Sequence, residues 1–178
     1  MVLITGASGG IGEACARLFA VDPRCRGLVL LARRKDRLEK LAKELAHKRD
    51  FEVHAFEVDV SKRKQVESFA KKSSELLSRV SILINNAGCA LGLDPIQDGK
   101  LDDWDAMIDT NLKGLLYVTH ALLPHFIARQ DGHIVNLGSV AGHETYAKGN
   151  IYCATKHGVK AITESLRIDL MGQPIRVS

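Results

Sequence analysis

Three polar side chains in the second half of the chain have the types and the spacing of a proton-transfer site. Tyr152 and Lys156 form a YxxxK pair, and Ser139 stands thirteen residues before the tyrosine. On a helix, side chains four residues apart share one face and lie about 6 Å from each other. Each feature alone also fits ordinary structure, an amphipathic helix for the pair or a turn for the serine. Their joint occurrence favours a site in which the Ser139 hydroxyl binds a substrate oxygen beside Tyr152.

A lysine at this spacing can supply what proton transfer by a tyrosine requires. A tyrosine that acts as an acid or base near neutral pH must have its pKa lowered from about 10, and a lowering by three pH units needs about 4 kcal/mol. One cation at about 4 Å supplies about that energy when the effective dielectric constant is near 20. We therefore predict that Lys156 activates Tyr152.

A glycine-rich turn near the N-terminus is a candidate phosphate-binding element. The sequence TGASGGIG runs from Thr5 to Gly12 and directly follows the apolar residues 2–4, which indicates strand, turn and helix in that order. Glycines let a ligand approach the backbone closely, and the N–H groups of the first helical turn attract a phosphate. Because glycine turns also serve as purely structural connections, the turn must be read with the residues that follow.

Two arginines after the next strand indicate the type of nucleotide. A site for NAD has a carboxylate about 20 residues past the glycines, where it binds the ribose 2′-hydroxyl. Residues 27–35 contain no Asp or Glu; Ala32 occupies the expected acidic position, and Arg33, Arg34 and Lys35 follow it. Three cations at the start of a helix lie at the positive end of its dipole, which argues against a merely solvated charge run. Since arginines match the geometry of a phosphate, we predict NADP(H) as the cofactor.

Strand-like and helix-like segments alternate along the chain and predict an α/β fold. The expected strands are 2–5, 27–32, 51–58, 81–85, 133–138 and 175–178, and the expected helices are 10–20, 35–48, 62–79, 102–128 and 151–171, with a loop at 90–101. This order implies a doubly wound parallel sheet of the Rossmann type, in one dinucleotide-binding domain of residues 1–178. Ligands of such sheets bind beyond the carboxyl ends of the strands. These ends carry Thr5, Ala32, Asp59, Asn85–Gly88 and Gly138–Ser139.

Two of the helices carry expectations about burial. Helix 10–20 has the apolar periodicity of a helix whose inner face holds Ile11, Ala14, Cys15, Leu18 and Phe19. Helix 102–128 has more apolar residues than one stripe can hold, so we expect part of it to pack on the sheet and part on another subunit. A fully buried helix of a monomer is the alternative.

The composition disfavours several other classes of protein. A chain of 178 residues with 46% hydrophobic residues and a mean hydropathy of -0.04 is typical of a soluble globular domain, and no run suits a membrane span. A dispersed net charge of +4 and an aromatic content of 5% disfavour a nucleic-acid surface. The scattered cysteines, with no CxxC pair, indicate reduced and mostly buried thiols in a cytoplasmic protein, and no metal site. Met1 leads directly into the first strand, so we expect no signal peptide.

Taken together, these residues resemble the short-chain dehydrogenase/reductase family. The matching motifs occur in the family's order over essentially the whole chain: T-G-x-x-x-G-x-G at Thr5–Gly12, Asp59-Val60, N-N-A-G at Asn85–Gly88, Asn111, Ser139, Tyr152 and Lys156. The resemblance implies an oxidoreductase that moves a hydride between the nicotinamide C4 and a substrate carbon.

The resemblance also implies a role for each matching residue. Tyr152 would be the general acid/base, Lys156 would in addition hold the nicotinamide ribose, and Ser139 would orient the substrate carbonyl or hydroxyl. Asn111 would hold a water that links Lys156 to solvent, Asp59 would contact the adenine, and the glycine turn would hold the pyrophosphate. The full set of expected cofactor-binding residues is Gly6, Ser8, Gly10, Ile11, Gly12, Arg33, Arg34, Asp59, Val60, Asn86, Ala87, Gly88, Tyr152 and Lys156.

The substrate is less defined by the sequence. Residues 90–92 and 104–111 resemble the NADP-dependent subgroup that acts on serine and short 3-hydroxy acids. The alternative substrate is another small alcohol or ketone. The alternative function is that of a truncated nucleotide-binding protein without activity. His143, Glu144 and Tyr146 follow Ser139 and could line the substrate pocket or form a surface loop.

The family pattern adds expectations about assembly and completeness. In the family, helices equivalent to 102–128 and 151–171 form the dimer interface, usually within a tetramer, so we expect a homodimer or homotetramer without nucleic-acid or membrane partners. The pattern continues past Ser178 with a substrate lid and further strands. We therefore expect the 178-residue chain by itself to be unstable or inactive, and the parent protein to be an active reductase.

Overall fold

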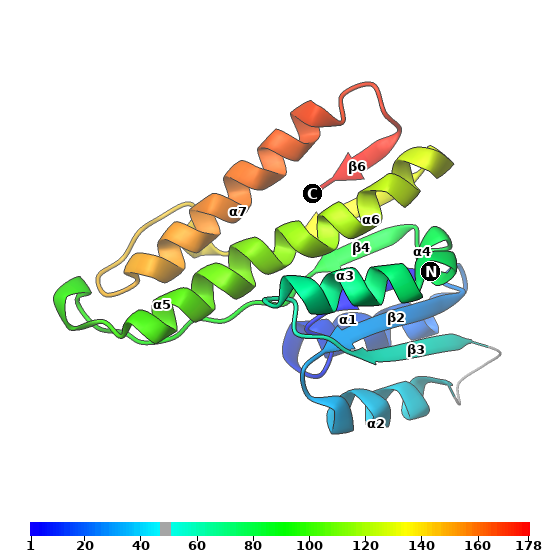
Figure 1. Ribbon diagram of the computed structural model, residues 1–178, viewed down its shortest axis with the longest axis horizontal. Coiled ribbons are helices and arrows are strands. Elements are labelled where there is room, and N and C mark those ends of the chain that lie inside the picture. Colours follow the sequence, from blue (N-terminus) through cyan, green and yellow to red (C-terminus); the bar gives the residue numbers. More distant parts are fainter. Residues whose placement is uncertain (47–50) are drawn as a thin grey trace.

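The computed structural model describes residues 1–46 and 51–178, and its strands form one parallel sheet in the order β3-β2-β1-β4-β5-β6 (Figure 1). The strands are β1 (Val2–Thr5), β2 (Gly27–Ala32), β3 (Glu52–Glu57), β4 (Ile82–Asn85), β5 (Gly132–Asn136) and β6 (Ile175–Val177). The helices are α1 (Gly10–Val21), α2 (Lys35–Ala46), α3 (Arg63–Lys72), α4 (Ser74–Ser78), α5 (Leu101–Ile108), α6 (Leu115–Arg129) and α7 (Asn150–Asp169). Three short helical segments are η1 (Ile96–Asp98), η2 (Asp109–Gly114) and η3 (Val140–Gly142). The predicted doubly wound parallel sheet is confirmed.

The strands form where the sequence has continuous apolar runs. Every residue of β1 and of β2 is buried, as parallel strands covered on both faces require. Strand β1 lies at the centre, with Leu3 opposite Val29 of β2 on one side and opposite Leu83 of β4 on the other. Successive strands are added in one direction up to β3 and in the other from β4 onward. The loops after β1 and β4 therefore diverge and leave a crevice at the carboxyl ends of the strands.

Helices cover the sheet on two faces, each with its own hydrophobic core (Figure 1). Helices α1 and α2 pack on one face, in a core that includes Ile4, Ala16, Leu30, Leu38, Leu41 and Leu45. Helices α3, α4 and α6 pack on the other face, in a core that includes Leu3, Val29, Phe69, Leu77, Leu122 and Phe126. These two layers hold the strands rigidly, so that the loops at their carboxyl ends are presented from a fixed frame.

The expected apolar face of helix α1 is confirmed for Cys15 and Phe19, which are partly buried and pack against the core, and is wrong for Ile11, Ala14 and Leu18. Ile11 and Leu18, placed on its inner face by their periodicity, are 58% and 68% exposed. The buried residues are instead Gly12, Ala16 and Ala20. Small side chains let the helix lie close to the sheet, and this leaves the larger apolar residues at the edge of the contact.

Two other expected helices differ in their course, and helix α2 agrees with its expected range where it is described. The helix expected at 62–79 is interrupted at Ser73 into α3 and α4. The helix expected at 102–128 begins at Leu101 and runs from α5 through the π-helical segment η2 into α6. Helix α2 begins at Lys35, so the two arginines before it precede the helix, and the expected residues 47 and 48 lie outside the described part of the chain.

The long helix buries one stripe and exposes part of a second. Leu115, Val118, Leu122 and Phe126 are buried against the sheet, whereas Leu116 and Ile127 are 43% and 41% exposed. Among the described residues, no helix is both long and apolar enough to cross a membrane. The cysteines are free, but only Cys153 is buried, and Cys15, Cys25 and Cys89 are partly exposed.

Candidate active site

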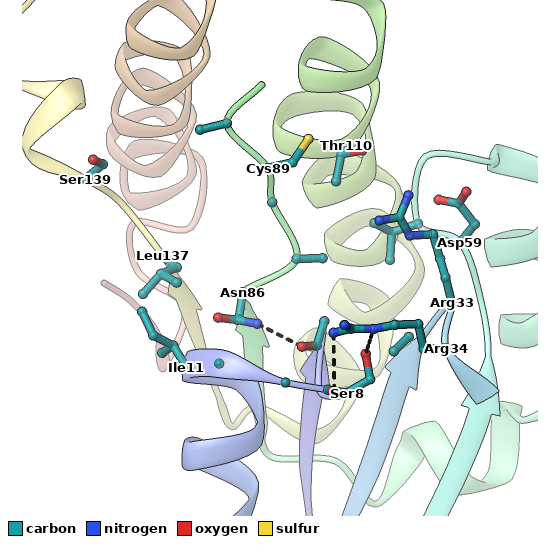
Figure 2. Close-up of a pocket in the computed structure, with 18 of the residues that line it drawn as sticks. Ser8, Ile11, Arg33, Arg34, Asp59, Asn86, Cys89, Thr110, Leu137 and Ser139 are labelled. Atoms are coloured by element: carbon teal, nitrogen blue, oxygen red, sulfur yellow. Dashed lines mark hydrogen bonds between the residues drawn. The ribbon is translucent and has the colours of Figure 1, made fainter. Parts of the chain in front are cut away.

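A cleft of about 580 Å³ opens at the carboxyl ends of the strands, where the direction of strand addition reverses (Figure 2). Its lining comes from the loops after β1, β2, β3, β4 and β5 and from α7. Fourteen of the expected residues line it: Gly6, Ser8, Gly10, Ile11, Arg33, Arg34, Asp59, Val60, Asn86, Ala87, Gly88, Ser139, Tyr152 and Lys156. The two expected residues behind its wall are Gly12 and Asn111, of which Asn111 is 3% exposed.

The glycine turn adopts a course that side chains would obstruct. Gly6 has a φ of +67°, in the left-handed region that favours glycine. A Cβ on Gly12 would lie 2.6 Å from the backbone oxygen of Gly6 and 2.5 Å from the side-chain nitrogen of Asn86. The turn thus passes close to the start of α1, where Gly10 and Ile11 line the cleft.

Thr5 and Asn86 join this turn to the loop after β4. The Thr5 hydroxyl accepts hydrogen bonds from the backbone N–H groups of Asn86 at 3.0 Å and of Ala87 at 2.9 Å. In return the Asn86 side-chain amide donates to the Thr5 carbonyl at 2.8 Å. Figure 2 shows its second, longer bond, to the Gly6 carbonyl at 3.4 Å. Asn86 therefore holds the two walls of the cleft together, and its amide is already committed to the protein.

The two arginines after β2 lie in different positions. Arg34 reaches back across the glycine turn, where its Nε donates to the Ser8 hydroxyl at 3.1 Å and its Nη2 to the Ser8 carbonyl at 3.3 Å. Arg33 extends away from the turn, toward the side on which Asp59 lies (Figure 2). Both side chains line the cleft beside Ala32, so this end offers cations and no carboxylate at the end of β2.

Asp59 stabilises its own turn. One carboxylate oxygen accepts hydrogen bonds from the Ser61 backbone N–H at 3.0 Å and from its hydroxyl at 2.7 Å. Its backbone N–H donates to the Gln65 side chain. The carboxylate thereby fixes the loop that ends β3 and places Val60 against Gly114 of η2.

Lys156 lies at the opposite end of the cleft and is 8% exposed. Its Nζ donates to the carbonyl of Leu137 at 2.8 Å and lies 5.9 Å from the centre of the Tyr152 ring. Burial lowers the pKa of Lys156 below its ordinary value, because removal from water disfavours the charged form. The helix can approach this closely because Gly142 packs on it: a Cβ there would lie 2.7 Å from the Lys156 backbone oxygen.

Ser139 caps the short segment η3 at the end of β5. Its hydroxyl oxygen accepts a hydrogen bond from the Ala141 backbone N–H at 3.2 Å. This bond fixes the oxygen while the hydroxyl hydrogen can still be donated into the cleft. Tyr152, one helical turn before Lys156, lines the same end of the cleft.

Asn111 lies in the π-helical segment η2 and connects three elements. Its side-chain oxygen accepts from the Cys89 N–H at 2.8 Å, and its amide donates to the Cys89 carbonyl at 2.9 Å and to the Thr155 hydroxyl at 3.0 Å. The oxygen and the nitrogen of the Asn111 side chain are thus already hydrogen-bonded to protein groups. A water held by this residue, as the resemblance implies, would have to use its backbone carbonyl.

The sequence analysis did not single out several residues of the cleft. Leu137 contributes through a backbone carbonyl, which no side-chain pattern reveals. Gly9 lies inside the glycine motif, which could have indicated it, and Cys89 directly follows the N-N-A-G motif. Val58, Ala90 and Thr110 line the cleft as well, together with Ala32 and Gly138, which were expected at the strand ends. Among the described residues, no three acidic, histidine or cysteine side chains gather as a metal site.

A family model described as short chain dehydrogenase matches residues 1–178, the whole of this sequence. The chain belongs to the short-chain dehydrogenase family. Several individual members of this family are similar to the chain over its whole length.

Three short-chain dehydrogenase relatives illustrate the range. The chain is 40% identical over 178 residues to the NADP-dependent 3-hydroxy acid dehydrogenase YdfG of Escherichia coli (strain K12), covering 100% of this chain and 69% of that protein. It is 47% identical over 179 residues to sulfoacetaldehyde reductase 2 of Chromohalobacter salexigens, again covering 100% and 69%. A solved closed form of serine dehydrogenase complexed with NADP+ superposes with a TM-score of 0.85 at 40% identity, covering 99% of this chain and 68% of that one.

Proposed function

We propose that this short-chain dehydrogenase is an NADP-dependent oxidoreductase that interconverts a small hydroxy compound and its carbonyl form, with Ser139, Tyr152 and Lys156 as its catalytic set. One observation carries the proposal: a single cleft holds these three residues at one end and Arg33 and Arg34 at the other. The names of the relatives support the same activity and the same cofactor.

The residues of the cleft fit an NADP molecule. The glycine turn and the N-terminus of the twelve-residue helix α1 suit the pyrophosphate. The absence of a carboxylate at Ala32 and the presence of Arg33 and Arg34 suit a 2′-phosphate. Asp59, Val60, Asn86, Ala87 and Gly88 form the walls between these ends. When bound, the nicotinamide supplies or accepts the hydride.

The protein's own residues manage the proton and the orientation of the substrate. The Ser139 hydroxyl donates to the substrate oxygen, because its lone pair is already bound to the Ala141 N–H. Tyr152 gives its phenolic proton to that oxygen during reduction and accepts it during oxidation. The Lys156 ammonium lies 5.9 Å from the centre of the Tyr152 ring, at the same end of the cleft. Asn111 supports this end by holding the Cys89 backbone and α7 together.

The substrate we propose is a small acid, with a short 3-hydroxy acid or serine as the leading candidates. The relatives named for 3-hydroxy acids and for sulfoacetaldehyde support this choice, since both compounds place the reacting carbon one methylene from an acid group. His143 follows η3 on the substrate side of Ser139 and is exposed, so it can contact such a group. Sulfoacetaldehyde is the second candidate, because that relative shares 47% of its residues with this chain.

A substrate panel with the purified full chain tests the proposal. Turnover would be followed by NADPH absorbance with serine, a short 3-hydroxy acid, sulfoacetaldehyde, and a neutral alcohol and ketone of matched size. We expect the highest kcat/KM for an acid-bearing compound, with Tyr152→Phe as the inactive control. Preference for the neutral compounds would overturn the substrate class. Tight NADP binding without turnover of any compound would instead indicate a silent nucleotide-binding protein.

We also propose a homodimer or homotetramer in the cytoplasm, formed through α5, α6 and α7. The exposed apolar residues Leu116 and Ile127 on α6, and Ile168 on α7, support such a contact. Sedimentation of the purified chain measures the state directly. A monomer at micromolar concentration would contradict this part of the proposal.

A further inference from the structure

Helix α7 carries both Tyr152 and Lys156, so its position decides whether the catalytic set is correctly placed. One attachment of this helix to the end of β5 is the bond from Lys156 to the Leu137 carbonyl. The family resemblance also implies that Lys156 holds the nicotinamide ribose, and its three N–H donors allow it to keep the Leu137 bond at the same time. Because this anchor is a group with a role in the site, an attachment that takes no part in the chemistry would hold the helix independently of it.

The structure contains such an attachment next to the first. The side-chain amide of Asn136, the residue before Leu137, donates to the Thr163 hydroxyl at 2.9 Å. Thr163 lies seven residues after Lys156, close to two helical turns, and so shares its face of α7. Among the described residues, no other hydrogen bond joins α7 to β5 or to Leu137.

This bond belongs to a chain of buried polar groups. The Thr163 hydroxyl donates in turn to the Val159 carbonyl of its own helix at 2.7 Å. The oxygen of the Asn136 side chain accepts from Asn85 of β4 at 2.9 Å, and Asn85 also donates to Thr119 of α6. Asn85, Asn136, Thr119 and Thr163 are all at least nine-tenths buried. Because a buried polar group without a partner is costly, the chain permits few alternative positions of α7.

We infer that Thr163 and Asn136 form a positioning strut for the catalytic helix. The strut fixes the axial position of α7 against β5, while the bond between Asn111 and Thr155 fixes its other side. Neither Thr163 nor Asn136 touches the reacting atoms in this assignment. They act through Tyr152 and Lys156, and the inference therefore rests on the proposed function of those two residues.

Thr163→Val tests the strut, because it keeps the shape of the side chain and removes the hydroxyl. We expect kcat to fall about tenfold to a hundredfold, since small displacements of catalytic groups have effects of that size. KM for NADPH should stay within about twofold of the wild-type value. The reason is that the end of the cleft with the glycine turn, Arg33 and Arg34, here called the phosphate end, is not attached to α7. The pH at which kcat is half-maximal should also shift in Thr163→Val. Thr163→Ser, which keeps the hydroxyl, should restore both kcat and this pH to their wild-type values.

The matched control is Leu45→Ala on α2, which destabilises the protein in a core remote from α7. If Thr163→Val acts only by lowering stability, Leu45→Ala will change kcat equally at a temperature where both are folded, and the inference fails. It also fails if Thr163→Val retains wild-type kcat. If that variant does not fold, Thr163→Cys replaces it, because a thiol is a weak acceptor. Equal kcat for the Cys and Ser variants then overturns the strut.

A second readout does not depend on activity. Cys153 is 1% exposed and neighbours Tyr152 on α7, so its alkylation rate reports how firmly this end is held. The folded holoprotein would be labelled and then digested, so that peptide mass spectrometry separates Cys153 from the partly exposed Cys15, Cys25 and Cys89. We expect faster labelling of Cys153 in Thr163→Val and not in Leu45→Ala. Faster labelling in a chain without any turnover would leave the strut supported and the proposed function contradicted. Unchanged labelling would overturn the strut.

Discussion

The two ends of the cleft are built in different ways. At the phosphate end, the polar groups are exposed arginines and the backbone N–H groups of the glycine turn. In the proposed function these exposed side chains would meet the charge of the ligand. At the catalytic end, Lys156, Asn111 and Thr155 are at least nine-tenths buried and bound to one another's elements. The phosphate end can therefore lose a side chain and keep its shape. At the catalytic end, removing one polar side chain leaves a buried hydrogen-bonding group of its neighbour without a partner.

The largest effect should come from Tyr152→Phe, which removes only the proton-bearing oxygen at the catalytic end. We expect kcat to fall by about 10²–10⁴ while KM for NADPH and the melting temperature stay near their wild-type values. Steady-state kinetics with the best substrate of the panel measure this. Tyr117→Phe on α6 is the matched control, and a Tyr152→Phe protein with more than a tenth of normal kcat would show that another group moves the proton.

A smaller and more selective effect should follow from substitutions at the phosphate end. Arg33→Ala and Arg34→Ala should each lower kcat/KM for NADPH about tenfold to a hundredfold, which corresponds to a charged hydrogen bond of about 1.5–3 kcal/mol. Values with NADH should change little. Arg34→Ala also removes the contacts to Ser8, so we expect it to weaken binding more than Arg33→Ala.

The control for these arginines is Arg37→Ala, which removes the same charge from an exposed position on α2. If Arg37→Ala lowers kcat/KM for NADPH equally, the effect is one of general charge and not of contact. Equal use of NADH and NADPH by the unmodified chain would contradict the assignment of the arginines altogether.

Gly12→Ala probes the one part of the phosphate end that is rigid. The added methyl group would lie 2.6 Å from the Gly6 backbone oxygen, so the turn or α1 must shift. We expect a loss of about 1–3 kcal/mol in the free energy of unfolding, measured by urea denaturation, together with weaker NADPH binding. Gly138→Ala is the control for stability, since nothing lies within 4 Å of its Cβ position. Similar losses in both variants would mean that close approach is not the reason for Gly12.

The smallest expected effect concerns the pH dependence of stability at the catalytic end. Burial lowers the pKa of Lys156, so the folded protein binds fewer protons than the unfolded chain between the lowered and the ordinary pKa. The cost of the buried charge is therefore fully present below the lowered pKa and disappears as the pH rises toward the ordinary value. Lys156→Met removes this cost but also leaves the Leu137 carbonyl without its partner. Removing the charge should raise the free energy of unfolding at neutral pH by an amount that shrinks in alkaline solution, whereas the loss of the hydrogen bond should not vary with pH.

Unfolding curves of both proteins at several pH values measure this difference. Lys160→Met, one turn further along α7 and exposed, should show no such trend. A difference between Lys156→Met and wild type that stays constant with pH would show that the lysine's charge is not the cause.

The phosphate end was also the easier one to predict from the sequence. Its residues are close together in the chain, from Thr5 to Gly12 and from Ala32 to Arg34, and their types suffice to indicate a phosphate site. Ser139, Tyr152 and Lys156 could be proposed as catalytic residues because of their spacing, and the structure brings them to one end of the cleft. Their supports could not be proposed, because the partners of Thr163 and Asn111 come from distant elements and depend on the tertiary packing.

The fold could be predicted where the most apolar residues are the buried ones. The prediction failed where the buried residues are instead the smallest ones. The apolar runs of β1 and β2 were read correctly because parallel strands are buried on both faces. The inner face of α1 was read correctly only in part, since its buried residues are Gly12, Ala16 and Ala20. The π-helical segment η2 was also missed, because its residues carry the same apolar periodicity as a regular helix.

The central position of β1 also sets the order in which the protein can assemble. As the chain is synthesised, β1 can pair with β2 early, but its other edge must wait for β4, some eighty residues later, where Val2 meets Ile82. Until then an apolar, fully buried strand presents an open edge, which is the kind of surface that aggregates. The hydrogen bonds between Thr5 and Asn86 form only when β4 pairs with this edge of β1. Nucleotide binding can therefore begin only after more than half of the sheet is complete.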